Sequence, residues 1–121
     1  MKTKNLFHSF DCAFKGLIYG IKTERNIKIH VLSMIGIIIL GFIFKINKTE
    51  WYICLLLFGN VISLEYINTA LEKIVDLYSP NRNELARIAK DVAAASVLVS
   101  AIVSATIGLM IFLPKIIEVI M

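Results

Sequence analysis

The feature that most constrains the fold is a run of 22 residues without a charge, from Val92 to Leu113. As a helix, such a run is long enough to cross the roughly 30 Å hydrocarbon core of a bilayer. Apolar residues make up 58% of the 121-residue chain and charged residues only 18%, against about 45–50% and about 25% in ordinary soluble domains. This composition argues against disorder, a nucleic-acid-binding tail and a disulfide framework. We therefore expect a single-domain integral membrane protein with no nucleic-acid partner.

Two further apolar segments precede this run. The first covers residues 27–46 and carries Lys28 and His30 near one end, where their polar groups can reach the interface. The second opens with the interfacial aromatic residues Trp51 and Tyr52. We predict three transmembrane helices, over residues 27–46, 51–76 and 86–113, within one domain spanning residues 1–121.

The N-terminal segment, residues 4–22, has apolar residues at helical spacing with charged and polar residues between them. This pattern predicts an amphipathic helix that lies in the membrane interface. Asp11 and Lys15 interrupt the apolar run that a signal peptide would need. Gly20 is expected to loosen the join to the first transmembrane helix.

The basic residues are distributed unevenly between the two sides that three crossings would create. Lys45, Lys48 and Lys115 would lie on one side, and the other ten of the 13 lysines and arginines on the opposite side. The larger group is Lys2, Lys4, Lys15, Lys22, Arg25, Lys28, Lys73, Arg82, Arg87 and Lys90. The positive-inside rule then predicts a cytoplasmic N-terminus and an external C-terminus.

Four polar residues on the second apolar segment share one helix face. Glu65, Asn68, Glu72 and Asp76 are separated by three, four and four residues, which places them in a stripe about 60° wide. An ionised Glu65 at membrane depth would cost roughly 2.5–3.5 kcal/mol on insertion scales. One interpretation is hydrogen bonding between helices with a neutral Glu65. The other is a cation site with a nearby proton acceptor.

Carboxylate oxygens stacked on one face suit Mg²⁺, which usually takes one or two protein ligands and fills the rest with water and phosphate. A magnesium ion that takes phosphate among its ligands implies that a nucleotide binds at this site. Glu24, at the start of the first transmembrane segment, could supply a second carboxylate to Glu72 from a neighbouring helix. The alternative is a solvated acid paired with Arg25 or Lys28.

Lys90 and Asp91 stand at the boundary of the last transmembrane segment. A lysine there could hold a phosphate, or it could be an interfacial anchor with Asp91 as its counter-charge. No Walker loop or G-x-G-x-x-G pattern occurs, so a nucleotide site would be of neither type. His8 and His30 fit interfacial polar residues better than ligands, and both cysteines fit free thiols.

Three crossing helices are not expected to cover a stripe of four polar side chains without help from another subunit. Self-association is therefore predicted. Small residues along the last segment would permit close helix contacts. They are Ala93, Ala94, Ala95, Ser96, Ser100, Ala101, Ser104, Ala105 and Gly108.

Three ordered blocks carry a family resemblance. Residues 65–72 read EYINTALE and precede Val75 and Asp76, residues 88–91 read IAKD, and residues 13–17 read AFKGL. Together with Glu24 and His30, these blocks resemble the prokaryotic diacylglycerol kinase family, in particular its undecaprenol kinase branch from Gram-positive bacteria.

The resemblance implies an all-α homotrimer in a bacterial plasma membrane, with active sites between subunits at the cytoplasmic surface. It also implies transfer of the γ-phosphoryl group of ATP to a lipid hydroxyl, with Mg²⁺ on the phosphates. By the same resemblance, Glu65 is the general base with Asn68 arranging it, Glu24 and Glu72 hold Mg²⁺, and Lys90, Asp76 and Asp91 serve the nucleotide. Undecaprenol is the predicted acceptor, with diacylglycerol as the alternative. A non-enzymatic helical bundle is the competing interpretation.

Overall fold

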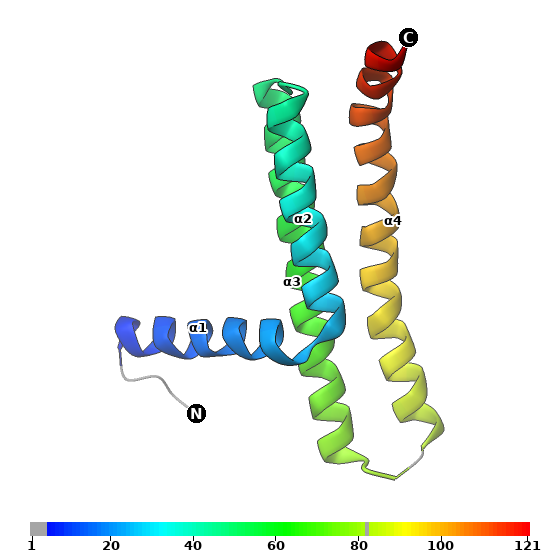
Figure 1. Cartoon of the computed structure of the whole chain (residues 1–121). Coiled ribbons are helices and arrows are strands. Elements are labelled where there is room, and N and C mark those ends of the chain that lie inside the picture. The colour runs from blue at the N-terminus through cyan, green and yellow to red at the C-terminus, as the bar shows by residue number, and fades with distance from the viewer. Residues whose placement is uncertain (1–4, 82) are drawn as a thin grey trace.

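The computed structural model describes residues 5–81 and 83–121, and this part of the chain contains four helices and no strand (Figure 1). They are α1 (Leu6–Thr23), α2 (Arg25–Ile43), α3 (Lys48–Tyr78) and α4 (Glu84–Ile120). The predicted all-α class is confirmed. Lys2, Lys4 and Arg82, used above in the charge argument, lie outside the described residues.

Asparagine side chains cap the N-termini of three helices. The Asn5 side chain accepts a hydrogen bond from the His8 amide at the start of α1, and the Asn83 side chain does the same for the first turn of α4. At the start of α3, Asn47 and Glu50 form a reciprocal capping box. Each cap satisfies amide groups that have no partner within the helix, so it fixes where the helix begins.

A single residue separates α1 from α2. Glu24 has extended backbone angles, φ −101° and ψ 116°, and α1 consequently lies across the direction of the other helices (Figure 1). The join is not at Gly20, contrary to the sequence-based expectation, because Gly20 is helical and buried beneath Tyr66. The Tyr66 hydroxyl donates a 2.7 Å hydrogen bond to the Leu17 carbonyl, which fastens α1 to α3.

The turn from α2 to α3 lies at the opposite end of the helices from α1 (Figure 1). Lys45 adopts a left-handed conformation, φ 53°, and the Ile46 amide donates to the Gly41 carbonyl at 3.1 Å. This is the hydrogen-bond pattern of a Schellman cap, with lysine in the position usually held by glycine. Ile46 then packs with Cys54 and Phe112 in a small core that joins α2, α3 and α4.

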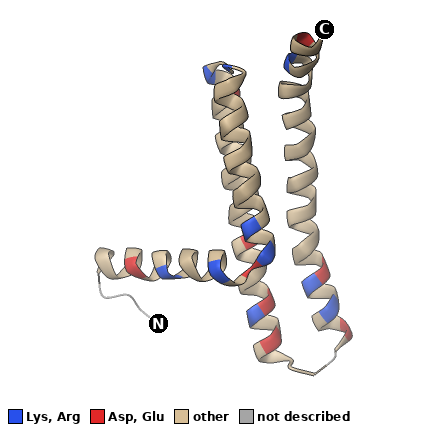
Figure 2. Ribbon diagram, in the orientation of Figure 1, with Lys and Arg blue, Asp and Glu red and all other residues tan. Residues whose placement is uncertain are grey.

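Helices α2, α3 and α4 are each long and apolar enough to cross a membrane. Only 11%, 28% and 11% of their most apolar windows are buried within the chain, so most of the hydrocarbon faces outward. Charged residues gather near the two ends of these helices and along α1, which leaves an uncharged middle (Figure 2). This distribution matches a protein whose middle section is solvated by lipid.

Helix α4 is longer than the predicted transmembrane segment, which ended at residue 113. The helix continues through Pro114 to Ile120, although proline lacks the amide hydrogen for one intrahelical bond. Lys115 Nζ lies 3.5 Å from Glu50 Oε1, so an ion pair connects this added turn to the start of α3.

The Gly20 packing yields a stability prediction. A Cβ at Gly20 would lie 2.3 Å from the Tyr66 ring, whereas a Cβ at Gly16 would meet nothing within 4 Å. We expect Gly20→Ala to lower the free energy of unfolding in detergent by about 1–3 kcal/mol, because the Tyr66 ring must move. Gly16→Ala, on the same helix, should be neutral or stabilising by up to about 1 kcal/mol. Denaturant titrations of both variants would test this, and equal stabilities would contradict it.

Candidate functional site

The polar stripe on α3 changes from buried to exposed along its length. Glu65 and Asn68 are only 3% and 6% exposed, Glu72 is half-buried and Asp76 is exposed. A single chain therefore buries the deeper half of the stripe, because α2 and α4 both pack against α3. The shallower half, Glu72 and Asp76, is not fully covered by the chain itself.

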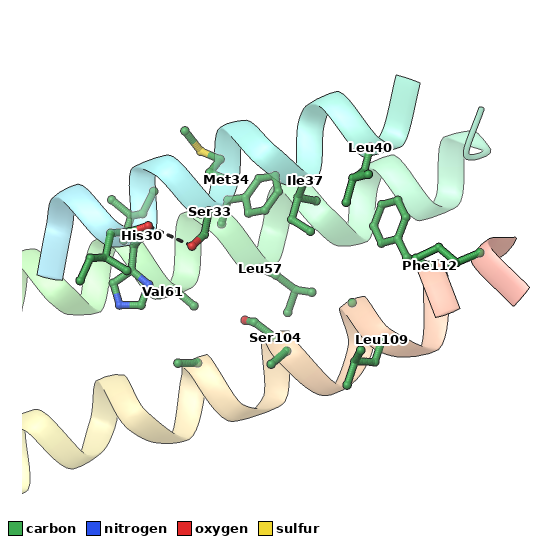
Figure 3. Close-up of a pocket in the computed structure, with 17 residues that line it drawn as sticks. His30, Ser33, Met34, Ile37, Leu40, Leu57, Val61, Ser104, Leu109 and Phe112 are labelled. Carbon is green, nitrogen blue, oxygen red and sulfur yellow. Dashed lines mark hydrogen bonds between the residues drawn. The ribbon is translucent and has the colours of Figure 1, made fainter. Parts of the chain in front are cut away.

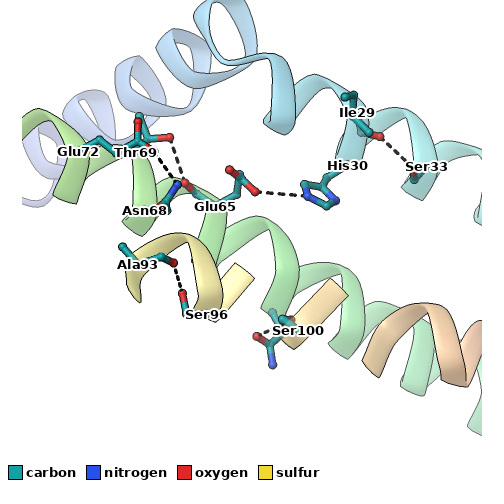
Figure 4. A network of polar contacts seen from close by, with 11 residues as sticks. Ile29, His30, Ser33, Glu65, Asn68, Thr69, Glu72, Ala93, Ser96 and Ser100 are labelled. Atoms are coloured by element: carbon teal, nitrogen blue, oxygen red, sulfur yellow. Dashed lines mark hydrogen bonds and ion pairs between the residues drawn. The ribbon is translucent and has the colours of Figure 1, made fainter. Parts of the chain in front are cut away.

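The Glu65 carboxylate faces a histidine on the neighbouring helix. His30 Nε2 on α2 lies 3.3 Å from Glu65 Oε2, and the two side chains point toward each other (Figure 4). Within the described residues, Glu65 Oε2 is buried and has no aligned hydrogen bond. His30 is thus a half-buried neighbour of Glu65, whereas the sequence suggested only an interfacial polar residue.

The Asn68 amide contacts Glu72 rather than Glu65. Its Nδ2 donates a 3.0 Å hydrogen bond to Glu72 Oε1, one turn further along α3 (Figure 4). The amide oxygen of Asn68 is buried and unpaired among the described residues. Asn68 therefore orients the Glu72 carboxylate and keeps an acceptor available beside it.

The start of α4 approaches the exposed end of the stripe. Lys90 Nζ on α4 pairs with Asp76 Oδ1 on α3, across the two helices. Asp91 instead accepts a 2.9 Å hydrogen bond from Arg87, which also pairs with Glu84, so Asp91 is not the counter-charge of Lys90. A polar hollow of about 750 Å³ adjoins these groups at the α3–α4 connection.

Glu24 lies at the corner between α1 and α2 and is half-buried. Among the described residues it forms no ion pair with Arg25 or Lys28, so that alternative has no support. The end of α1 reaches over α3 at this corner, where Lys73 Nζ lies 5.8 Å from the centre of the Tyr19 ring. No cluster of three or more potential metal ligands occurs in the described ranges 5–81 and 83–121.

A cavity of about 610 Å³ opens between α2, α3 and α4, with His30 at one end and Phe112 at the other (Figure 3). Its lining is almost entirely apolar, and His30 is its single ionisable side chain among the described residues. Ser33 is satisfied by the Ile29 carbonyl, while the Ser104 hydroxyl is buried without a described partner. The shape and lining suit a hydrocarbon chain that ends near His30 and Glu65.

The contact between His30 and Glu65 is not among the features predicted from the sequence. The available signal was that each is an ionisable residue inside an apolar segment, near the same end of two consecutive helices. Ionisable residues at membrane depth seldom remain unpaired, so this signal favours a contact between the two side chains.

Fold and site together define an all-α protein of membrane type that combines a buried carboxylate and an apolar cavity with a charged hollow where α3 ends and α4 begins. Comparison with known proteins identifies the family within this class. Residues 11–112 match the model of the prokaryotic diacylglycerol kinase family, and the chain belongs to this family. It is therefore a lipid kinase that uses ATP, which confirms the resemblance and excludes the non-enzymatic bundle.

Two relatives illustrate the range of the family. The chain is 44% identical over 109 residues to undecaprenol kinase of Bacillus subtilis (strain 168), covering 90% of this chain and 89% of that protein. It is 36% identical over 115 residues to diacylglycerol kinase of Synechocystis sp. (strain ATCC 27184 / PCC 6803 / Kazusa). That alignment covers 94% of this chain and 66% of the cyanobacterial protein.

Proposed function

We propose that the protein phosphorylates undecaprenol, transferring the γ-phosphoryl group of ATP to the lipid hydroxyl to give undecaprenyl phosphate. The observation that carries this proposal is the 44% identity to an undecaprenol kinase over nearly the full length of both chains. Diacylglycerol is the second candidate acceptor, because a diacylglycerol kinase is 36% identical. The long apolar cavity supports an acceptor with an extended hydrocarbon chain in either case.

Glu65 is the general base of this proposal. Its burial and its position beside the His30 end of the cavity support this role. As the lipid oxygen attacks the γ-phosphorus, its proton passes to Glu65. The bond from phosphorus to the bridging oxygen breaks, and ADP leaves with that electron pair.

Lys90 would contact a phosphate of ATP, with Asp76 and Asp91 supporting the nucleotide site. In the free protein Lys90 is paired with Asp76, and its side chain remains 40% exposed. An exposed ion pair is weak, so an incoming phosphate can replace the carboxylate at little energetic cost. Asp91 acts through Arg87, which it holds at the edge of the hollow beside Lys90.

Glu24 and Glu72 would hold Mg²⁺. Two carboxylates suit a magnesium ion that takes its remaining ligands from phosphate and water. Asn68 supports this donor set, since its amide fixes one Glu72 oxygen and its own unpaired carbonyl oxygen lies nearby. The bound ion would neutralise the charge of the phosphates.

The assembly and orientation also belong to the proposal. We infer a homotrimer with active sites between subunits, and a single kinase domain with spans over residues 27–46, 51–76 and 86–113. The largely outward-facing apolar surface of α4 and its small residues support packing against other subunits. The distribution of lysine and arginine supports a cytoplasmic N-terminus and active site in a bacterial plasma membrane.

The acceptor and the base can be tested in one assay. Purified protein in mixed micelles would receive radiolabelled ATP, Mg²⁺ and either undecaprenol or dioleoylglycerol. We expect a higher kcat/KM for undecaprenol, and a loss of about 10²–10⁴-fold in kcat for Glu65→Gln with either lipid. Glu118→Gln, at the far end of α4, is the matched control and should retain full activity. Preference for dioleoylglycerol would reject the first acceptor, and an active Glu65→Gln would reject the base.

The metal assignment has its own readout. Glu72→Gln should raise the Mg²⁺ concentration needed for half-maximal rate by about 10-fold or more, because a charged ligand oxygen is lost. Rates would be measured over a Mg²⁺ titration at saturating lipid, again beside Glu118→Gln. An unchanged titration midpoint would contradict a metal-binding role for Glu72.

The trimer can be tested by mass and by subunit mixing. A detergent-corrected mass should be three times the 13.6 kDa of one chain. If sites form between subunits, mixing inactive Glu65→Gln with inactive Lys90→Ala chains should restore part of the activity, because some sites combine two intact partners. A monomeric mass, or a trimer that shows no complementation, would overturn the corresponding part of the proposal.

A further inference from the structure

The contact between His30 and Glu65 is unused by the mechanism described so far. We propose that His30 is a positioning residue, whose neutral imidazole donates a hydrogen bond from Nε2 to the Glu65 carboxylate and holds it toward the apolar cavity. The proposal rests on Glu65 being the general base. It adds a second residue, from another helix, to the proton-accepting part of the site.

The geometry leaves few other donors for this carboxylate. Glu65 Oε2 is buried and has no aligned hydrogen bond among the described residues, and His30 Nε2 lies 3.3 Å away. This distance is slightly longer than an aligned hydrogen bond of about 2.7–3.2 Å. Catalytic hydrogen bonds are often long in free enzymes and shorten when substrate binds.

The backbone of α2 holds His30 in place. Ile27, one turn earlier on α2, is completely buried, and its side chain lies beside Gly20 of α1. This packing fixes the rotation of α2 about its axis, because a turn of the helix would expose Ile27. His30 therefore faces Glu65 as a consequence of packing near the corner between α1 and α2.

A neutral donor suits a base at membrane depth better than a full positive charge would. An ionised carboxylate in apolar surroundings needs hydrogen bonding to remain charged. A lysine or arginine at this position would form an ion pair and weaken the carboxylate as a proton acceptor. The α4 residues across the cavity, including Ala101, Ser104 and Ala105, carry no charge, so Glu65 is the charged partner of the imidazole.

The position of His30 also connects the base to the acceptor. His30 contacts Glu65 and lines the end of the 610 Å³ cavity, so a lipid hydroxyl at that end would lie beside the imidazole, with Glu65 directly behind it. A hydrocarbon chain in the cavity would pack against the imidazole ring and restrict its motion. His30 would thus align the base when the acceptor is bound.

Kinetic variants provide the test. In the mixed-micelle assay, we expect His30→Ala to lower kcat by about 10- to 100-fold, below the about 10²–10⁴-fold that a general base provides, with the KM for ATP unchanged. His30→Gln, whose amide can reach the position of Nε2, should recover most of the rate. Added imidazole should partly rescue His30→Ala. His8→Ala removes the other histidine, exposed on α1, and should be fully active without any response to imidazole.

The outcomes separate this proposal from the one on which it rests. If Glu65→Gln is inactive while His30→Ala keeps the wild-type kcat, only the role of His30 is rejected. Equal losses in His30→Ala and His30→Gln, without imidazole rescue, would indicate packing alone and also reject it. In the double variant, His30→Ala should add no further loss to Glu65→Gln, because the group it positions is gone. An active Glu65→Gln would instead reject the base itself.

Discussion

The structure depends on keeping a carboxylate inside a helix that is long and apolar enough to cross a membrane. Glu65 is almost completely buried, and an unpartnered charge at that depth would oppose insertion of α3. Two neighbouring helices reduce this cost. Helix α2 brings His30 to the carboxylate, and α4 packs along α3. The apolar cavity begins beside this polar contact, so apolar side chains of the cavity and ionisable side chains lie next to each other at His30.

A second constraint is the sharp corner at Glu24. One extended residue allows α1 to lie across the direction of the three long apolar helices, which is the arrangement that the predicted interfacial helix requires. The hydrogen bond from Tyr66 to the Leu17 carbonyl and the close packing at Gly20 hold α1 in that direction. The corner leaves the apolar side chains of α1 exposed, where they can contact lipid.

Much of the local structure could be predicted, and the limits have physical causes. Hydropathy and length identified the three long apolar helices, and asparagine caps set the starts of α1, α3 and α4 close to where they were expected. Helix α4 continues beyond residue 113, where the predicted span ends, because Ile116 packs against the core of Ile46, Cys54 and Phe112 in spite of Pro114. The sequence predicts a loose join at Gly20, whereas in the structure its missing side chain makes room for Tyr66.

The sequence by itself determined that Glu65, Asn68, Glu72 and Asp76 share one helix face, because an α-helix has 3.6 residues per turn. It also determined which family the chain resembles, because the three sequence blocks can be recognised without a structure. Only the tertiary structure decided their partners: His30 beside Glu65, and Lys90 with Asp76. Contacts between helices depend on their rotation and on the angle at which they cross. Those are set by the packing of many side chains from distant parts of the chain, which no local spacing encodes.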